Sequence, residues 1–497
     1  PNDTTNPLAQ RILKITSAIY RKYAGVRNRN LEEWISTWDH KSINSGMPEK
    51  GAVDGWYYTA LLNELNVVSN QKSAGGSIDI YKCFDQINRK LIYKLAEKAG
   101  MPSKILKPYY RMIDDLEISY QIGQNLGEPN KDRCSIPQGC PFSMLMVSLL
   151  LRPWVIIAEE QGVEPRVLAD DLLFMASGDD HLKKATLVMT KSLDFFEDIG
   201  AKVAHNKCFM FASEAASRKA LQAHDWGSKN KNITIPVKTN FRDLGTHLNF
   251  TGNTNAKTLT DRIWSAARMC DRLAWLGLNT KIKEKIIMTN ILPAALYGCE
   301  SCAINQNAIM HLKSIISQAV GPKSSKRSVE MAFHFSDCAK DLDPDVHILY
   351  RRAAEMRRSI AKHRGRLGTI KLIIKRLMEN QQKQMQNHEK AKQKPFFCDR
   401  WKKNQNQVLD ELGSVGPVTL LINEIEKYGY HLNDNLTIVK EGEVPIDMLN
   451  MPWNHFKNAI MDIPQRARSL TMNTKRTYLG EVQEVDNGMI KQIVNHF

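Results

Sequence analysis

The feature that most constrains this chain is a pair of adjacent acids, Asp170 and Asp171, between two apolar runs. Residues 163–177 are strongly apolar and predict a strand, a tight turn at residues 169–171 and a second strand. Burying a bare carboxylate is costly, so two acids in a buried hairpin require a compensating charge such as a divalent cation. On the evidence of this stretch alone, an ordinary exposed Asp-Asp turn is an equally good interpretation.

A further acid, Asp79, lies in a second stretch of strand character, residues 77–81. If the two strands are neighbours, three carboxylates converge at one edge of a sheet. Hard oxygen ligands in this number suit Mg²⁺, which also binds waters and substrate phosphates. Two such ions about 3.5–4 Å apart stabilise the attacking and leaving oxygens of an in-line phosphoryl transfer. The three acids therefore predict a nucleotidyl-transfer site with two magnesium ions.

The order of the expected elements indicates an α+β fold. Residues 8–70 have helical spacing, and strands and helices then alternate. The expected strands are 77–81, 118–122, 163–177 as a hairpin, 203–211 and 241–248, and the expected helices are 91–99, 144–158 and 182–199. From residue 258 to about residue 385 the pattern is helical, and a small mixed tail follows. The length of 497 residues, with 42% hydrophobic and 25% charged residues, is that of a globular chain of two to four domains.

Most of the positive charge lies in one segment. The chain has a net charge of +16, and residues 351–403 hold 17 Lys and Arg against four acids. A block in which one sign dominates favours a polyanionic partner over a solvated helix face, so we expect nucleic acid. No apolar run approaches the ~20 residues of a membrane span, and we expect no membrane partner.

The nine cysteines have no regular spacing, which is typical of a protein with reduced thiols. We therefore expect an intracellular protein, and the nucleus and the organelles are candidate compartments. Cys299 and Cys302 form one Cys-x-x-Cys pair, but no second pair follows at zinc-site spacing. Trp264 and Trp275 lie in the helical region, where core packing is the favoured interpretation over base stacking.

Five short motifs occur in a fixed order. They are Asp79-Ile80-Tyr81-Lys82-Cys83-Phe84-Asp85, Pro137-Gln138-Gly139-Cys140-Pro141-Phe142-Ser143, Leu168-Ala169-Asp170-Asp171, Gly200-Ala201-Lys202-Val203-Ala204-His205-Asn206-Lys207 and Phe241-Arg242-Asp243-Leu244-Gly245. In order and spacing they resemble motifs A to E of reverse transcriptases of the non-LTR retrotransposon and group II intron kind, over residues ~40–300. Leu168 stands where motif C usually has an aromatic residue, so we expect altered fidelity or rate with retained chemistry.

The resemblance implies a right-hand polymerase fold, with a palm whose antiparallel sheet packs on helices and a helical thumb. The implied domains are partial fingers at 1–76, a palm with interleaved fingers elements at 77–250, a thumb at 251–330, a basic helical extension at 331–403 and a small C-terminal region at 404–497.

The resemblance also implies roles for the motif residues. Asp79 and Asp170 bind both Mg²⁺ ions, the main-chain carbonyl of Ile80 is a further metal ligand, and Asp171 supports the pair. Lys207 is expected as the general acid that protonates the leaving pyrophosphate.

Further residues are implied to contact substrate. Phe84 stands at the sugar gate, where an aromatic ring clashes with a ribose 2′-hydroxyl, and it therefore indicates dNTP substrates. Gln138 and Gly139 follow the template and the nascent pair, and Leu244 and Gly245 form the primer grip. The expected nucleic-acid-binding arginines are Arg268, Arg272, Arg351, Arg352, Arg357 and Arg358.

The leading function is a retroelement-encoded RNA-directed DNA polymerase, a magnesium-dependent nucleotidyltransferase that extends a primer 3′-hydroxyl. Its partners are template RNA, a DNA or RNA primer and dNTPs, and a ribonucleoprotein assembly is a further candidate. Two alternatives stay open: an intron maturase that binds RNA for splicing, and a domesticated scaffold. Three acids held together argue against the scaffold, which has no use for them.

Overall fold

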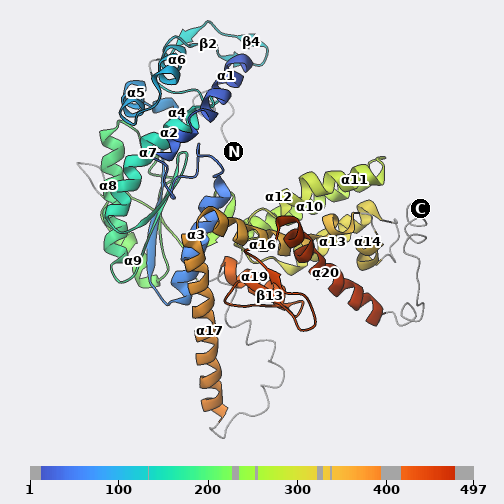
Figure 1. Cartoon of the computed structure of the whole chain (residues 1–497). Coiled ribbons are helices and arrows are strands. Elements are labelled where there is room, and N and C mark those ends of the chain that lie inside the picture. The colour runs from blue at the N-terminus through green and yellow to red at the C-terminus, as the bar shows by residue number, and fades with distance from the viewer. Residues whose placement is uncertain are drawn as a thin grey trace. The chain divides into compact units, whose positions relative to one another are not determined.

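The computed structural model describes residues 13–132, 134–226, 234–251, 256–321, 328–335, 338–392 and 416–475 (Figure 1). The chain divides into two compact units. The first comprises Pro1–Gly55 and Gln71–Thr239, and the second comprises Trp56–Asn70 and Asn240–Phe497. None of the helices in these ranges is long and apolar enough to cross a membrane.

The first unit is built on a five-stranded sheet with the strand order β6-β7-β1-β8-β9. Its strands are β1 (Ser73–Asp79), β6 (Glu164–Leu168), β7 (Asp171–Ser177), β8 (Phe209–Ala212) and β9 (Val237–Lys238). β6 pairs with β7, β7 with β1 and β1 with β8, all antiparallel, and β9 pairs with β8 in parallel. The central strands β1 and β7 are buried along most of their length, which explains the apolar run of β7 and the small residues of β1.

Helices pack against this sheet. α7 (Ser143–Glu160) contacts β6, and α8 (His181–Asp198) contacts β1 and β7, as the ribbon in Figure 1 also shows. Both helices were expected at these positions, and both are confirmed. The other helices of this unit are α1 (Ala18–Arg29), α2 (Glu32–Ser36), α4 (Cys83–Gln86), α5 (Arg89–Lys98), α6 (Ser103–Asp114) and α9 (Ala215–Ala223).

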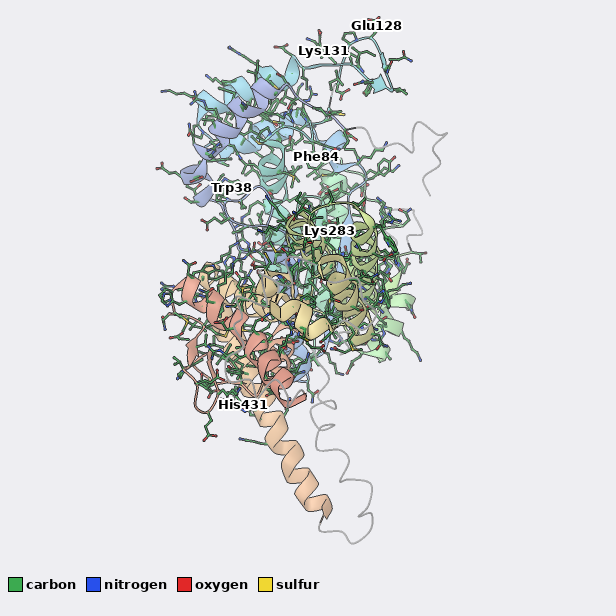
Figure 2. All side chains as sticks on the ribbon, turned by 90° about the vertical axis from the view of Figure 1, so that its right-hand side faces the viewer. Trp38, Phe84, Glu128, Lys131, Lys283 and His431 are labelled. Carbon is green, nitrogen blue, oxygen red and sulfur yellow. The ribbon has the colours of Figure 1, made fainter. Side chains whose placement is uncertain are left out.

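A small ribbon of paired strands follows α6. β2 (Glu117–Ile118) pairs with β5 (Asn130–Lys131), and β3 (Gln121–Ile122) pairs with β4 (Asn125–Leu126). Almost all of its side chains are exposed, and Figure 2 labels two of them, Glu128 and Lys131. The strand expected at residues 118–122 is therefore two short strands of a solvated ribbon.

The second unit is mostly helical. It contains most of α3 (Ala52–Val68) and the hairpin β10 (Asn240–Asp243) and β11 (Thr246–Asn249). A helical bundle follows, formed by α10 (Lys257–Trp275), α11 (Thr280–Ile286), η2 (Ile287–Ile291), α12 (Leu292–Ala295), α13 (Gln306–Val320), α14 (Val329–Phe335) and α15 (Ala339–Leu342). The buried faces of α10, α12 and α13 share one apolar core.

The chain then forms α16 (Pro344–Lys362) and α17 (Gly365–Lys392), which carry much of the basic segment. Beyond it lie α19 (Pro417–Glu426), a sheet of β12 (His431–Leu432), β13 (Thr437–Val439) and β14 (Ile446–Asp447), and α20 (Trp453–Lys475). α16 packs against both α19 and α20, so residues 416–475 are an integral part of this unit.

The α+β fold class with an antiparallel-rich sheet on helices is confirmed, whereas two further expected strands, besides that at residues 118–122, were wrong in detail. Residues 241–248 form a hairpin and not one strand, because Leu244 and Gly245 both adopt left-handed backbone conformations that reverse the chain. Residues 203–211 are interrupted by a turn, since the Lys207 main-chain N–H donates to the Ala204 carbonyl. The predicted domain boundaries stay predictions.

Candidate active site

The register of the sheet brings the motif acids together at one end. β1 and β7 run antiparallel, and Asp79 lies directly opposite Asp171. Leu168 also pairs with Asp171, so Ala169 and Asp170 form the two-residue turn between β6 and β7. Residues directly opposite each other in an antiparallel pair have Cβ atoms about 4.5–5.5 Å apart, so these carboxyl groups share one small region.

The turn that carries Asp170 is held by buried hydroxyl groups. Ala169 has φ of +53°, a conformation that costs free energy for a residue with a Cβ atom. Its main-chain N–H donates to Ser45 Oγ at 2.8 Å, and Ser45 Oγ lies 2.9 Å from Ser148 Oγ. Ser45 thus stabilises the turn from outside motif C, and no sequence signal singled it out.

Two buried thiols, those of Cys83 and Cys208, lie beside the acids. Burial, with further contributions from Asp170, Asp79 and Asp85, raises the pKa of Cys83 to about 12. The main-chain N–H of Asp79 contacts Cys208 Sγ at 3.5 Å, and burial raises the pKa of Cys208 to about 11. Both thiols therefore stay protonated at neutral pH and do not compete with the carboxylates for a metal ion.

Lys207 reaches the same end of the sheet. Its Nζ lies 3.5 Å from Oδ1 of Asp79, and its side chain is 62% exposed. The preceding turn is placed by a bridge between Ile80 and Val203, in which the Ala204 N–H donates to the Asp79 carbonyl. The structure thus brings Lys207 to the acids although 128 residues separate it from Asp79.

This arrangement fits an open magnesium site and not a closed cage. In the described part of the chain no three or more His, Cys, Asp or Glu side chains are placed so that they could together hold a metal ion. Mg²⁺ usually binds one or two carboxylates and takes its other ligands from water and substrate phosphates. Asp79, Asp170 and Asp171 supply the hard oxygens that such an ion requires.

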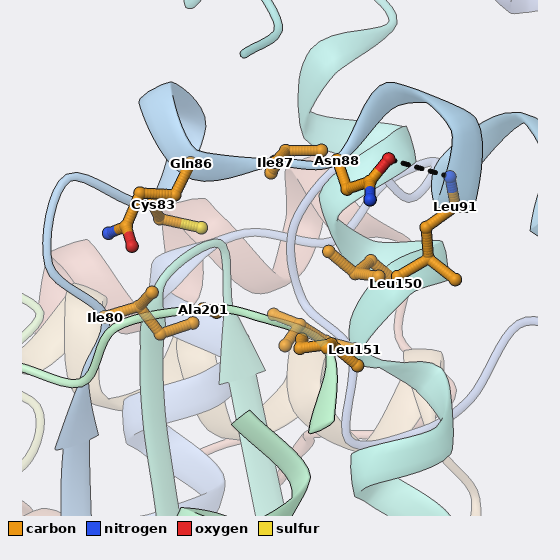
Figure 3. A pocket seen from close by; sticks show the side chains of 10 residues that line it. Ile80, Cys83, Gln86, Ile87, Asn88, Leu91, Leu150, Leu151 and Ala201 are labelled. Atoms are coloured by element: carbon orange, nitrogen blue, oxygen red, sulfur yellow. Dashed lines mark hydrogen bonds between the residues drawn. The ribbon is translucent and has the colours of Figure 1, made fainter. Parts of the chain in front are cut away.

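Ile80 can contribute only its main chain. Its side chain is buried and, with Cys83 and Ala201, lines a small, mainly apolar pocket that is partly open to solvent (Figure 3). The bridge to Val203 uses the Asp79 carbonyl and the Tyr81 N–H, which leaves the Ile80 carbonyl outside these two hydrogen bonds. This fits the ligand role that the motif implied for that carbonyl.

Phe84 lies in α4, the short helix that follows β1. Its ring is partly buried against the core of the first unit, and Figure 2 labels it. Its carbonyl accepts a hydrogen bond from the Ile136 N–H at 3.0 Å, which links motif A to the segment that precedes motif B.

The motif B turn is covered by a segment of protein. The Gly139 N–H donates to the Lys14 carbonyl at 3.1 Å, and a Cβ at Gly139 would lie 2.8 Å from that oxygen. Lys14 is 8% exposed, and its ammonium contacts Asp132, Ser135 Oγ at 2.7 Å and Asp85 at 3.6 Å. The close approach of the Lys14 main chain thus favours glycine at position 139, and the contact of Gly139 and Gln138 with template stays a prediction.

The primer-grip turn is held within the second unit. Tyr297 Oη donates to the Leu244 carbonyl at 3.2 Å and accepts from Trp56 Nε1 at 3.2 Å. Arg262 donates to the Tyr297 carbonyl at 3.0 Å and lies over the Tyr297 ring. A Cβ at Gly245 would lie 3.1 Å from that ring, so close packing favours glycine there in addition to its left-handed backbone.

The six predicted nucleic-acid-binding arginines have different environments. Arg268 and Arg272 are exposed on one face of α10. Arg352 is 4% exposed and donates to Glu424 at 2.6 Å and to the carbonyls of Cys299 and Leu420. Its predicted role is wrong, because a guanidinium inside the fold cannot reach a phosphate.

The other three arginines of the basic segment also have partners within the protein. Arg351 pairs with Glu300 at 2.9 Å, and Arg358 pairs with Glu355 at 3.3 Å. Arg357 lies over the rings of Trp453 and Phe456.

Cys299 and Cys302 are buried thiols. The Cys302 thiol donates to the His247 carbonyl at 3.2 Å, and burial raises the pKa of both groups. The expectation of core packing was wrong for Trp275, which is 77% exposed, and only partly right for Trp264, which is 37% exposed and lies against the His311 ring at a tilt.

Solved structures similar to this chain include telomerases from two Candida species. The apo telomerase from Candida tropicalis is 13% identical, with 70% of this chain and 59% of that chain covered and a TM-score of 0.35. The telomerase from Candida albicans in complex with a fragment of telomeric RNA is 11% identical, with 74% and 55% covered and a TM-score of 0.36. This chain spans less than two thirds of their length, and a comparison with curated proteins gives no match.

A protein-family comparison matches the chain over motifs A to E. The family is described as reverse transcriptase (RNA-dependent DNA polymerase), and its model matches residues 5–248. The reverse-transcriptase part of the resemblance is thereby confirmed, while the non-LTR and group II kind stays a prediction. Residues 5–248, just under half of this chain, are thus similar to the reverse transcriptase domain that this family model describes.

Proposed function

We propose that the protein is an RNA-directed DNA polymerase, encoded by a retroelement, that extends a primer 3′-hydroxyl with dNTPs on an RNA template. The observation that carries the proposal is the placement of Asp79 opposite Asp171, with Asp170 in the adjoining turn, inside the stretch that matches the reverse transcriptase family. In cells the substrate RNA brings the protein into a ribonucleoprotein assembly.

Each residue of the site has its own role in nucleotidyl transfer. Asp79, Asp170 and the Ile80 carbonyl hold a pair of Mg²⁺ ions, and Asp171 supports the pair. When bound, such ions lower the pKa of the primer hydroxyl and neutralise charge on the triphosphate. Lys207, exposed and 3.5 Å from Asp79, donates a proton to the leaving pyrophosphate. Phe84 rejects the 2′-hydroxyl of an NTP by steric contact.

Primer extension tests the proposal. Wild type is given an RNA template, a DNA primer, Mg²⁺ and either dNTPs or NTPs, beside the double variant Asp170→Asn, Asp171→Asn. We expect dNTP incorporation by wild type and a loss of about a hundredfold or more in the variant, because the charge stabilisation supplied at such a site amounts to several kcal/mol.

The matched control is Asp194→Asn, which removes an exposed acid of α8 and should leave the rate unchanged. Incorporation that persists in the Asp170, Asp171 variant would exclude these acids from the reaction. Equal incorporation of NTPs and dNTPs would exclude Phe84 as the sugar gate.

A further inference from the structure

One buried ammonium group links motif A to the segment that leads into motif B. The side chain of Lys14 is 8% exposed, and its Nζ contacts Asp132, Ser135 Oγ at 2.7 Å and Asp85 at 3.6 Å. Asp85 is the last residue of motif A and directly follows Phe84 in α4. A buried charge needs partners that replace its lost hydration, so these contacts determine where the Lys14 side chain lies.

The main chain around Lys14 lies against the motif B turn. The Gly139 N–H donates to the Lys14 carbonyl at 3.1 Å, and Thr16 Oγ1 donates to the Gly139 carbonyl at 3.2 Å. Tyr20 Oη lies 3.2 Å from Cys140 Sγ, one residue further along the motif. Residues 14–20 therefore hold the motif B turn at several points, and Lys14 reaches both motifs through different atoms.

The segment before motif B continues the connection to Phe84. The Ile136 N–H donates to the Phe84 carbonyl, and the Ser135 N–H donates to the Ile87 carbonyl, both at 3.0 Å. These bonds lay residues 135–136 along the chain that carries the Phe84 ring. The main chain at Phe84 is thus held by the same residues that Lys14 contacts.

Ser135 has a backbone conformation that needs such support. Its φ is +85°, a left-handed value that costs free energy for a residue with a Cβ atom. Its hydroxyl accepts from Lys14 Nζ and donates to Asp132 Oδ2 at 3.1 Å. Burial alone would raise the pKa of Asp132, but the Lys14 ammonium lowers it, so this carboxylate is charged at neutral pH. An ion pair therefore holds the backbone from which Ile136 reaches Phe84.

We propose that Lys14 is a positioning residue for sugar selection, because it holds residues 135–136, and through them Phe84, in a fixed place relative to motif B. The inference rests on the proposed function, in which the Phe84 ring rejects the ribose 2′-hydroxyl. Steric rejection of one hydroxyl requires a ring that cannot move aside, since a displacement of ~1 Å can change a rate by ~100-fold. Lys14 itself touches no substrate, because protein oxygens already surround its ammonium.

Primer extension tests this through the ratio of kcat/KM for a dNTP to kcat/KM for the matching NTP. Lys14→Met keeps most of the length of the side chain but removes the ammonium. It should lower the ratio roughly tenfold, mainly through faster NTP incorporation. Lys14→Arg keeps the charge and the donors and should restore most of the ratio.

A double-variant cycle with Phe84→Ala separates positioning from an independent effect. Phe84→Ala should itself lower the ratio, and adding Lys14→Met should lower it no further, because the ring on which Lys14 acts is gone. Ser135→Ala removes a single hydroxyl from the cluster and should lower the ratio by a smaller factor. This milder variant supplies the test if Lys14→Met does not fold.

The matched control for a loss of stability alone is Arg218→Met. Arg218 donates to the carbonyls of Ala212 and Ser213 at 2.9 Å and 2.7 Å, and the Ser213 N–H donates to the carbonyl of Ser73, which begins β1. Asp79 lies at the other end of that strand, ~20 Å away. The ratio for Arg218→Met should equal that of wild type.

Each outcome has a distinct meaning. Wild type that prefers dNTPs, with an equal preference in Lys14→Met and Ser135→Ala, would overturn the inference and leave the proposed function intact. Losses that add in the double variant, or an equal loss in Arg218→Met, would also overturn it, because Lys14 would then not act through Phe84. Wild type that fails to extend any primer would instead overturn the proposed function.

Discussion

The buried carboxylate of Glu64 caps a distant helix and has a raised pKa. It lies in α3 and has no exposed surface, and its oxygens accept from the N–H of Val418, the N–H of Thr419 and Thr419 Oγ1. It therefore caps α19, whose first main-chain N–H groups have no helical partner. Burial raises the pKa of Glu64 to about 7 although these hydrogen bonds oppose the change.

The raised pKa predicts a pH-dependent stability of the second unit. Between 4.5, the ordinary value, and about 7 the folded state binds more protons than the unfolded state, so the free energy of unfolding falls as the pH rises. We expect a loss of about 3 kcal/mol between pH 4.5 and pH 8, because a tenfold change in the acid dissociation constant on folding corresponds to ~1.4 kcal/mol. Urea unfolding of wild type and Glu64→Gln checks this, and an identical pH dependence of both proteins would contradict it.

At the scale of single residues, the sequence was most informative where a motif fixes a chemical group. Asp79, Asp170, Asp171 and Lys207 were predicted from their motifs, and the sheet brings them to one end. Ser45 and Lys14 were not predicted as parts of the site, because each acts through a partner more than 100 residues away. Arg352 was misjudged because a run of basic residues does not reveal which of them point inward.

At the scale of elements, the central strand β1 depends on two glycines. A Cβ at Gly75 would lie 2.1 Å from the Phe174 carbonyl oxygen and 2.5 Å from the Phe211 ring. A Cβ at Gly76 would lie within 3 Å of Met210, Met189 and Phe174. The missing side chains allow the neighbouring strands and α8 to pack closely around β1, the strand that ends at Asp79.

Gly75→Ala should therefore destabilise the first unit by about 1–3 kcal/mol, the usual cost of overpacking a core. The matched control is Gly25→Ala in α1, where a Cβ would meet nothing within 4 Å and alanine favours the helix by about 0.5–1 kcal/mol. The midpoint of urea unfolding, followed by circular dichroism, measures both. A midpoint for Gly75→Ala at or above that of wild type would show that β1 and its neighbours accommodate the added methyl group without loss of stability.

Long elements could be predicted better than short ones for a physical reason. α8 buries residues at helical spacing and α7 buries a long apolar run, over 18 residues each, and both patterns are visible in the sequence. The hairpin at residues 240–249 was expected as a single strand because Leu244 is an apolar residue that adopts a left-handed conformation. Apolar residues rarely do so, and their presence gives no turn signal.

At the scale of the whole molecule, the net charge of +16 overstates the charge that is available to a partner. Arg351 and Arg352 of the basic segment pair with Glu300 and Glu424 inside the second unit. Lys371 and Lys375, by contrast, are exposed on α17. Only exposed cations release counterions from nucleic acid on binding, so the position of a charge matters more than its count.

Changing Lys371 and Lys375 to Gln should therefore weaken binding to a primer–template duplex and lower the slope of log Kd against log salt by about 1.4–1.8. The control is the double variant Arg351→Gln, Glu300→Gln, which removes a paired cation without leaving a buried acid alone. We expect its slope to equal that of wild type. The same slope in all three proteins would show that α17 does not contact the duplex.

The link between Glu64 and Thr419 also has a consequence for how the protein is made. The two residues are 355 positions apart. At ~5–20 residues per second, a ribosome needs roughly 20–70 seconds to pass from one to the other. During that interval α3 has been synthesised without the helix that Glu64 caps, so the second unit cannot complete its folding until residues 416–426 have been translated.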